Sequence, residues 1–252
     1  MMKFFAKYCY FIFFCTFGIN TYSSTNSVKS FEVEGGVLQT NNMEIYGYQQ
    51  ESATKGWKSN EPTVRLEFWK RSDKWNFGTV FQPLYSSYSG KLSSDLNYND
   101  KIYSKGDNGT LKYQFHTIRQ TANYPVLNFV SGGYLRLGAS LVARYAQLDF
   151  TTNTNSFHSK NFIVLPLLNY ELSIPISSRY SFFSRADFLP SPTDNLFLDG
   201  LYDCLFALKY KLNNGRSIDG GIRLFFGGYD PKTPNDYANK IFFNAFVLRY
   251  NF

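Results

Sequence analysis

The sequence predicts an all-β chain that folds as a transmembrane antiparallel up-and-down β-barrel of about ten strands, with eight or twelve as alternatives. Three observations predict this class. Segments in which apolar and polar residues alternate recur along the chain, as in strands with one apolar face. Aromatic residues make up 19% of the 252 residues, with 26 Phe and 20 Tyr, an excess that aromatic girdles at two membrane interfaces would use. Short connections also alternate with longer polar ones, as barrels with tight turns at one end require.

The first 23 residues have the pattern of a signal peptide. Lys3 and Lys7 give a charged start, and residues 8–17 (YCYFIFFCTF) form an apolar run. Residues 21–23 then offer small side chains at a cleavage site. The apolar run is shorter than the ~20 residues that a spanning helix needs. We therefore expect export and removal of residues 1–23.

The mature chain is then residues 24–252, which we expect to form a single barrel domain. Phe14 precedes Cys15 where a lipoprotein signal requires a small residue, so lipid attachment is not expected. Cys204 would be the sole cysteine left, which excludes an intramolecular disulfide and a cysteine-rich zinc site. No later run is apolar enough for a spanning helix, and the mean hydropathy of −0.30 is too polar for a helical membrane protein.

Ten segments carry the alternation of a strand. In the first, 29–41, Phe31 and Val33 share a face, and the alternation extends to Ile45. In the fourth, Leu111, Tyr113 and Phe115 share the face expected to meet lipid, which would turn Lys112, Gln114 and His116 inward. The other segments lie near 64–69, 75–81, 135–145, 160–174, 178–190, 197–212, 217–229 and 241–252.

The connections fall into two length classes. Short turns are expected at 71–74, 176–179 and 213–216, where polar residues and Gly are frequent. Longer polar stretches lie around 49–61, 86–109, 151–159, 190–197 and 230–240. The stretch 121–132 should be a short turn but is longer and partly apolar. It is either a small periplasmic element or a further strand that would change the count.

The last strand carries the most specific signal. Phe246, Leu248, Tyr250 and Phe252 lie on one face, and Arg249 lies on the other. This ending resembles the C-terminal signal read by the outer-membrane insertion machinery. The mature chain as a whole resembles the small outer-membrane β-barrel superfamily of Gram-negative bacteria. The resemblance implies an outer-membrane location, contact with outer-membrane lipid and lipopolysaccharide, and a last strand that pairs with the first.

Charged residues opposite the apolar faces are expected to line the interior. A barrel of about ten strands is near the size that side chains fill, whereas open channels need roughly 16–18 strands. We therefore expect a barrel plugged by paired charges, with a narrow porin-like pore for small solutes as the alternative. The predicted interior network comprises Arg65, Glu67, Arg136, Arg144, Glu171, Arg185, Asp187, Asp199, Asp203, Lys209, Asp219, Arg223 and Arg249.

An enzymatic alternative involves His158, Ser159 and Glu171. The set resembles the Ser-His-Glu triad of the outer-membrane lipid A deacylases, and chemically it could act as base, nucleophile and orienting carboxylate. Two features depart from that family. Adjacent strand residues point to opposite faces, and thirteen residues at about 3.3 Å each place Glu171 ~40 Å from His158. We therefore expect no enzymatic activity.

Other partners are constrained by composition. The formal net charge of +7 comes from scattered residues without a basic cluster, so nucleic-acid binding is not expected. The two histidines, His116 and His158, are too few for a metal site, and no cofactor is expected. The 86–109 loop and its edge carry Tyr85, Tyr88, Tyr98 and Tyr103 among polar residues. This mixture suits recognition of a host or other extracellular ligand at the cell surface, and a disordered polar loop is the equal alternative.

Overall fold

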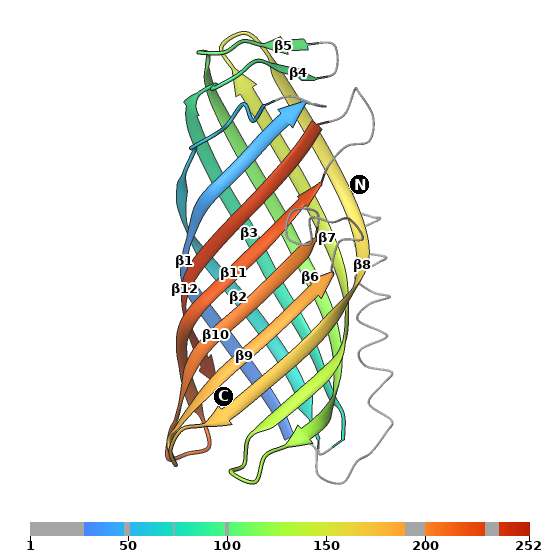
Figure 1. Ribbon diagram of the computed structural model, residues 1–252, viewed down its shortest axis with the longest axis vertical. Coiled ribbons are helices and arrows are strands. Elements are labelled where there is room, and N and C mark those ends of the chain that lie inside the picture. Colours follow the sequence, from blue (N-terminus) through green and yellow to red (C-terminus); the bar gives the residue numbers. More distant parts are fainter. Residues whose placement is uncertain (1–27, 48–50, 73, 99–100, 190–199, 230–236) are drawn as a thin grey trace.

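The computed structural model describes residues 28–252, apart from 48–50, 73, 99–100, 190–199 and 230–236. Its ten long strands pair antiparallel and close into a barrel in which β12 meets β1 (Figure 1). These strands are β1 Val28–Gly47, β2 Ser59–Arg71, β3 Asn76–Lys91, β6 Asn108–Asn128, β7 Tyr134–Thr152, β8 Ser156–Pro175, β9 Tyr180–Leu189, β10 Leu201–Lys211, β11 Ser217–Tyr229 and β12 Tyr237–Asn251. The predicted fold class and strand number are therefore confirmed.

Two further strands form a small separate sheet. β4 (Leu96–Tyr98) and β5 (Lys101–Tyr103) pair with each other, in the connection between β3 and β6. They lie over one end of the barrel, the upper end in Figure 1. Across the residues that the structure describes, no helix is long and apolar enough to cross a membrane.

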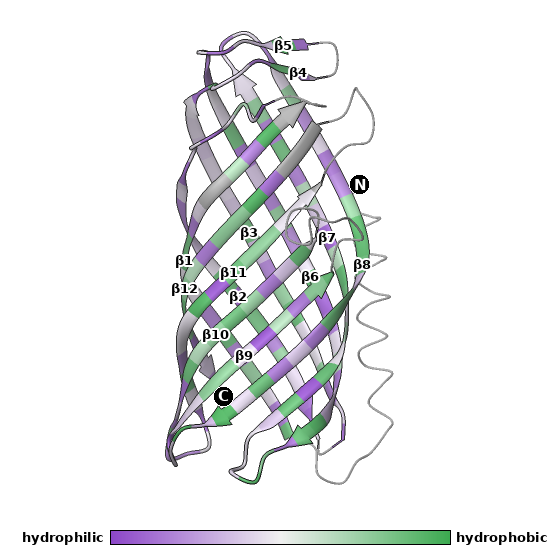
Figure 2. Cartoon of the chain, in the orientation of Figure 1, coloured by the Kyte–Doolittle hydropathy of each residue, from purple (hydrophilic) through white to green (hydrophobic). Residues whose placement is uncertain are grey.

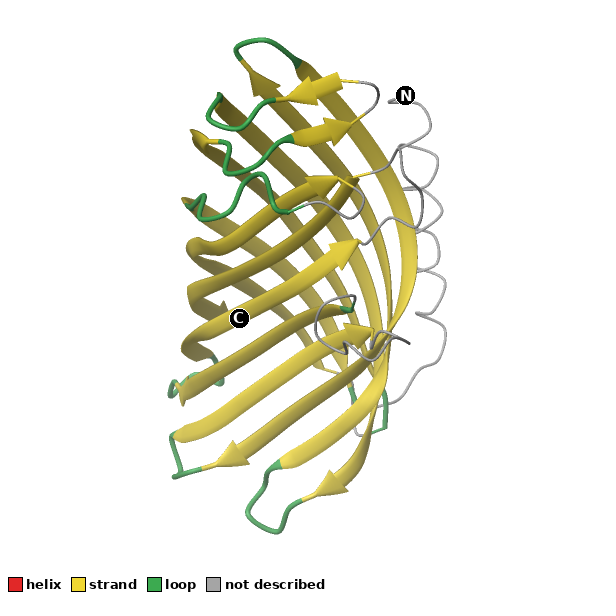
Figure 3. Ribbon diagram, turned by 45° about the horizontal axis from the view of Figure 1, so that its top comes forward, coloured by secondary structure: helices red, strands yellow, loops and turns green. Residues whose placement is uncertain are grey.

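The connections differ between the two barrel ends, as Figure 3 shows. At the lower end the chain turns within a few residues between β2 and β3, β6 and β7, β8 and β9, and β10 and β11. The stretch 121–132 is mostly strand, because β6 continues to Asn128 and leaves only a Gly132 turn with φ of 85°. It is therefore neither an extra strand nor a separate element. We call the lower end periplasmic and the upper end extracellular, following the proposal made below.

Two of the expected long loops are shorter than predicted. β3 continues to Lys91 and β6 begins at Asn108, so both edges of the predicted 86–109 loop belong to these strands. β7 and β8 are joined across 153–155 alone, where the Thr152 amide donates to the Asn155 carbonyl oxygen at 2.8 Å. The polar residues of 151–159 are mostly strand residues at the extracellular rim.

The outer wall of the barrel is apolar. Exposed large apolar side chains recur at alternate positions, such as Leu137 and Leu141 on β7, Val164 and Leu168 on β8, and Phe246 and Leu248 on β12. Apolar positions recur along every barrel strand in Figure 2. A belt of this kind is far larger than the apolar patches of soluble proteins. It has the character of the lipid-facing band of a transmembrane barrel.

Aromatic side chains border this belt at both ends. Near the periplasmic turns the ring of Phe31 lies 4.6 Å from Phe68 and 5.7 Å from Phe252. Towards the extracellular end, the ring of His116 lies between those of Tyr85 and Tyr145, at 5.0 and 6.3 Å. His116 is thus on the outer wall and not in the interior as expected. Rings with an apolar body and a polar edge suit the two membrane interfaces.

Candidate functional site

A single network of charged side chains lies in the periplasmic half of the lumen. Eight strands contribute inward-facing residues to it, and ion pairs connect all of its members. The seven carboxylates are Glu32, Glu34, Glu67, Glu171, Asp187, Asp203 and Asp219, and the seven cations are Arg65, Arg71, Arg119, Arg185, Lys209, Arg223 and Arg249. The network, hereafter the lumen network, is therefore neutral.

Asp203 on β10 is the central carboxylate in the upper part of the lumen network. Its carboxylate accepts hydrogen bonds from three guanidinium groups, those of Arg65, Arg119 and Arg223, which come from three other strands. The Arg65 Nη1 to Asp203 Oδ2 distance is 2.8 Å. One carboxylate therefore ties together β2, β6, β10 and β11, of which β2 and β6 lie far from β10 in the sequence.

Arg185 on β9 has the matching role among the cations. It contacts Glu67, Glu171 and Glu32, the last two at 3.2 and 3.5 Å. Arg65 Nε also donates to Glu67 Oε1 at 2.7 Å, which joins the Arg185 group to the Asp203 group. Charge-assisted bonds of this type are the strong ones, and planar guanidinium groups are suited to making several at once.

Aromatic rings fill the space beside the charges. The guanidinium groups of Arg71 and Arg185 lie 4.9 and 4.6 Å from the Trp69 ring. The Trp69 indole N–H donates to Glu67 Oε2 at 2.8 Å. Arg71 is 24% exposed, which makes it the most accessible member of the lumen network. A cation over a ring face gains further electrostatic attraction where water is excluded.

The sequence located most of the lumen network. Of the predicted interior residues, ten occupy it: Arg65, Glu67, Glu171, Arg185, Asp187, Asp203, Lys209, Asp219, Arg223 and Arg249. Arg136 lies at the periplasmic mouth, where it donates to the Ser72 carbonyl oxygen at 3.4 Å and contacts the Tyr134 ring. Arg144 lies above the lumen network. Asp199 lies outside the described residues.

Four members were missed. Glu32 and Glu34 alternate with Phe31 and Val33, so the alternation of the first strand held the signal that places both carboxylates inward. Arg71 was assigned to a turn, although it is the last residue of β2. Arg119 was missed because the fourth segment was assigned the wrong orientation.

The extracellular half of the lumen is apolar, and this corrects the predicted orientation of β6. Leu111, Tyr113 and Phe115 point inward and are buried, whereas Lys112 and His116 point outward. The inward residues join a cluster with members from β1, β3, β7, β10 and β12. The apolar face of β6 was expected to meet lipid. In this half of the barrel, that face points inward and forms part of the core.

The β4–β5 hairpin packs over this cluster at the extracellular end. Tyr103 is buried with its ring 5.3 Å from that of Phe150, and the Tyr98 ring lies 4.5 Å from that of Phe157. Lys101 Nζ donates to the Ser156 carbonyl oxygen at 3.0 Å. These contacts hold the described part of the hairpin on the barrel rim.

Most of the tyrosines proposed for recognition are not accessible to an extracellular ligand. Tyr88 is buried inside the barrel, where its hydroxyl group lies 2.8 Å from Thr40 Oγ1 and donates to Ser86 Oγ. Tyr103 is buried, and Tyr98 packs on the rim. Tyr85 is exposed but lies on the outer wall at the aromatic border. The hairpin instead presents Ile102, which is 63% exposed, together with neighbouring polar residues.

The structure does not bring the candidate triad together. His158 points outward and bonds through Nδ1 to Asp149 on β7. Ser159 lines a cavity inside the wall, and Glu171 accepts hydrogen bonds from Arg71, Arg185 and Tyr134 in the lumen network. Within the described part of the chain, no group of three or more His, Cys, Asp or Glu residues is placed to hold a metal ion.

The residues of the expected insertion signal lie where the alternation places them. Phe246, Leu248 and Phe252 are exposed on the outer wall, and Tyr250 lies between the last two on the same face. β12 pairs with β1 over their length, from Glu32 opposite Asn251 to Gly47 opposite Tyr237. The expected pairing of the last strand with the first is therefore confirmed.

No protein-family model and no curated protein matches the sequence. Solved structures similar to the chain include the translocator domain of autotransporter NalP from Neisseria meningitidis, with 9% identity, TM-score 0.46, and 92% and 90% of the two chains covered. Others are Ail, the attachment invasion locus protein of Yersinia pestis (7%, TM-score 0.37, 88% and 98%), and Neisserial surface protein A (14%, 0.33, 88% and 95%). These neighbours are Gram-negative outer-membrane β-barrel proteins. At these identities and TM-scores no role is transferred from them to the chain.

Proposed function

We propose that the chain is an outer-membrane β-barrel protein of a Gram-negative bacterium, closed to solutes, with a structural or surface-interaction role. In this proposal residues 1–23 are a cleaved signal peptide and residues 24–252 form the barrel domain. The location is supported by the apolar outer wall with aromatic residues at both borders. The outward aromatic residues of β12 and the exposed Phe252 that follows it are the surface that the barrel-insertion machinery would read.

The single observation that carries the closed barrel is the lumen network. Its fourteen charged side chains occupy the periplasmic half, and Trp69 and Phe183 fill the space between them. An open aqueous pore would hydrate such charges, whereas here most are buried and paired with one another. The apolar cluster and the β4–β5 hairpin then obstruct the extracellular half.

The outer rim also offers a contact for lipopolysaccharide. Lys112, Asp149 and His158 are directly opposite one another on β6, β7 and β8, and Lys160 lies in the next row. All four side chains point outward, beyond the aromatic border at Tyr145. Lys112 and Lys160 are exposed cations where the phosphate groups of lipopolysaccharide would lie.

The surface role rests on the ordered hairpin. Its exposed residues include Asn97, Lys101 and Ile102, a polar surface with one apolar side chain. A ligand that binds it would meet a preformed surface and would spend little free energy on ordering the loop. Deleting residues 96–103 should abolish such binding and leave the folded barrel, whose strands do not pair with the hairpin.

Planar-bilayer recording tests the closed lumen. The purified full chain, shown to be folded by heat-modifiable migration on a gel, should give no discrete conductance steps. An opened variant provides the positive control: Trp69→Ala removes the largest ring of the periplasmic half. Regular steps from the wild-type protein would favour the narrow pore for small solutes instead.

Location needs an independent test. Separation of membranes should place the protein in the outer-membrane fraction, and its intact mass should correspond to a chain that begins near residue 24. A soluble protein, or one whose migration is unchanged by boiling, would contradict the proposed location.

A further inference from the structure

Much of β8 has one edge without a partner strand among the described residues. β8 pairs with β7 from Ser156 to Ser173, but it pairs with β9 only from Leu168 onwards. Within the described residues, no strand pairs with the other edge of 156–167. In Figure 1, β8 continues upward past the ends of β9, β10 and β11. The extracellular half of the barrel is therefore incompletely hydrogen-bonded on this side.

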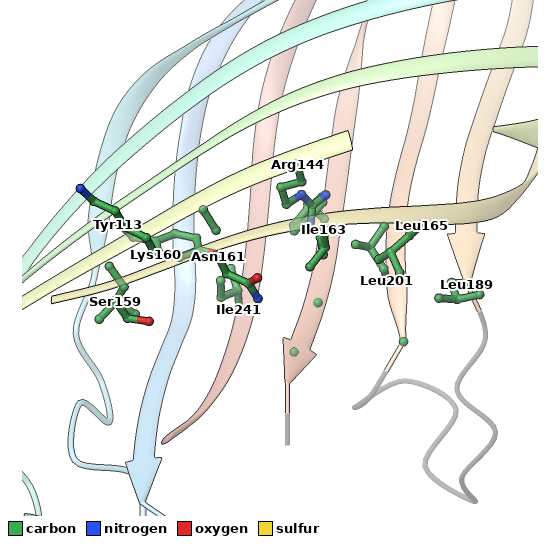
Figure 4. Close-up of a pocket in the computed structure, with 16 residues that line it drawn as sticks. Tyr113, Arg144, Ser159, Lys160, Asn161, Ile163, Leu165, Leu189, Leu201 and Ile241 are labelled. Carbon is green, nitrogen blue, oxygen red and sulfur yellow. The ribbon is translucent and has the colours of Figure 1, made fainter. Parts of the chain in front are cut away.

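A cavity of about 390 Å³ lies inside this edge (Figure 4). Inward-facing Ile163 and Leu165 of β8 line one side, and Leu189, Leu201 and Phe225 from the ends of β9, β10 and β11 line the other. The volume lies within the roughly 300–1,000 Å³ of small-molecule sites. Lys160 points outward yet also borders the cavity, so the cavity reaches the strand edge.

Arg144 is the inward-facing charged group of this cavity, whereas Lys160 borders it from the outer face of β8. Its guanidinium lies beside a pair of neighbouring rings, 4.9 Å from that of Phe115 and 5.1 Å from that of Phe225. Its Nε donates to Thr117 Oγ1 at 3.4 Å, and within the described residues it forms no ion pair with a carboxylate. The two ring centroids are 5.4 Å apart, so the rings cover one side of the guanidinium, and Arg144 also lines the cavity, where its Nη N–H donors can meet an occupant. Two parallel donors in a plane match the two oxygens of a carboxylate.

Charge balance indicates the charge of the occupant. The lumen network below is neutral, with seven carboxylates and seven cations, so it has no spare carboxylate for Arg144. A charge held away from bulk water is costly unless a counter-ion reaches it. One negative charge on the occupant would neutralise Arg144, and the Ile, Leu and Phe side chains around it would take an apolar chain.

We propose that this cavity binds a small carboxylate amphiphile, of the medium-chain fatty-acid class, with its carboxylate on Arg144 and its chain between Ile163, Leu165 and Leu201. The ligand enters past the unpaired edge of β8. The outward side chains of that edge, Phe162 and Val164, are 46% and 50% exposed and lie in the apolar belt. An amphiphile in the outer leaflet would therefore approach the cavity through lipid and not through the obstructed lumen.

Equilibrium binding of radiolabelled decanoate to the full chain in lipid nanodiscs tests the proposal, with empty nanodiscs subtracted. Decanoate should bind at least about tenfold more tightly than decanol, which has the chain without the charge. Arg144→Met keeps an apolar side chain of similar length and should weaken decanoate binding by about tenfold or more, with less than about a twofold change for decanol. Arg136→Met, at the opposite end of the lumen, is the matched control and should bind decanoate like the wild type.

A second variant tests the cavity without removing a charge. Ile163→Trp should fill the cavity and abolish the binding of both decanoate and decanol. If Arg144→Met does not fold, this variant tests whether the cavity is the binding site. The proposal is overturned if decanoate binds no more tightly than decanol, or if the folded variants retain wild-type affinity. Conductance and membrane location are measured separately, so a failure here leaves the closed-barrel function standing.

Discussion

Asp203→Asn is the substitution that most sharply tests the energetic role of the lumen network. The Asp203 carboxylate contacts three guanidinium groups, those of Arg65, Arg119 and Arg223. The amide of Asn keeps the shape and one acceptor oxygen but removes the charge. Seven cations then share six carboxylates in a buried site. No other carboxylate contacts all three guanidinium groups, so none can replace Asp203.

The expected cost is large for a single substitution. Removing one member of a buried ion pair usually costs about 3–5 kcal/mol, because the remaining charge stays buried without compensation. The Asp203 site belongs in this range, since its contacts are almost fully buried. With an m-value of about 1–3 kcal/mol per M, the urea midpoint should fall by at least about 1 M.

Reversible urea unfolding in lipid vesicles, followed by tryptophan fluorescence, measures this change. Asp107→Asn is the matched control, because Asp107 lies in the extracellular connection and has no side-chain hydrogen bond or ion pair within the described structure. It should change the free energy of unfolding by no more than about 0.5 kcal/mol. Adding Arg65→Gln to Asp203→Asn restores equal charge while Glu67 keeps Arg185, so the double variant should lose less than the sum of the two single losses.

If the free energy of unfolding of folded Asp203→Asn lies within about 1 kcal/mol of the wild-type value, the Asp203 contacts do not stabilise the barrel as a buried ion pair does. Strict additivity in the double variant would equally show that the Arg65–Asp203 contact contributes no coupling.

Three further predictions concern separate parts of the barrel. Gly78→Val should cost about 1–3 kcal/mol in the same urea assay, because a Cβ at Gly78 would lie 2.5 Å from the Trp69 ring; an unchanged midpoint would contradict this packing. Arg71→Met should lower the free energy of unfolding less than Asp203→Asn does, because Arg71 is 24% exposed and water can replace its two ion pairs. An equal loss would show that water is excluded from its ion pairs as fully as from those of Asp203. Asn155→Ala removes the 2.9 Å bond to the Ile102 carbonyl oxygen and should speed trypsin cleavage after Lys101, read by mass spectrometry; an unchanged rate would mean that this bond does not hold the hairpin.

The sequence was sufficient for the architecture because alternation is a local property. Strands with one apolar face, such as β12, reveal their orientation directly, and the inward position of Arg249 follows from it. The apolar face of β6 was assigned to lipid because the periodicity of a strand does not say which side its apolar face meets. In this barrel the lumen is charged at one end and apolar at the other. Leu111 and Arg119 therefore share the inward face of one strand.

Contacts between distant strands could not be read from the sequence. The pairing of Glu34 with Arg223 and of Arg119 with Asp187 depends on barrel closure and stagger, which set the height of each residue in the lumen. The short β4–β5 hairpin was also missed, because three-residue strands leave almost no periodic signal. The cavity beside β8 follows from where β9 and β10 end, and boundaries are the least predictable property of a strand.

Hydrogen exchange at the arginine Nε–H groups, measured by NMR on the protein in lipid nanodiscs, tests the filled lumen most directly. The Nε–H groups of Arg65 and Arg249 donate to Glu67 and Asp219 at 2.7 and 2.9 Å in a buried site. Arg216, on an exposed turn, serves as the internal reference. Buried ion pairs should give slow exchange at Arg65 and Arg249, and exposure should give fast exchange at Arg216. Equally fast exchange for all three would mean that water fills the lumen and that the barrel is open.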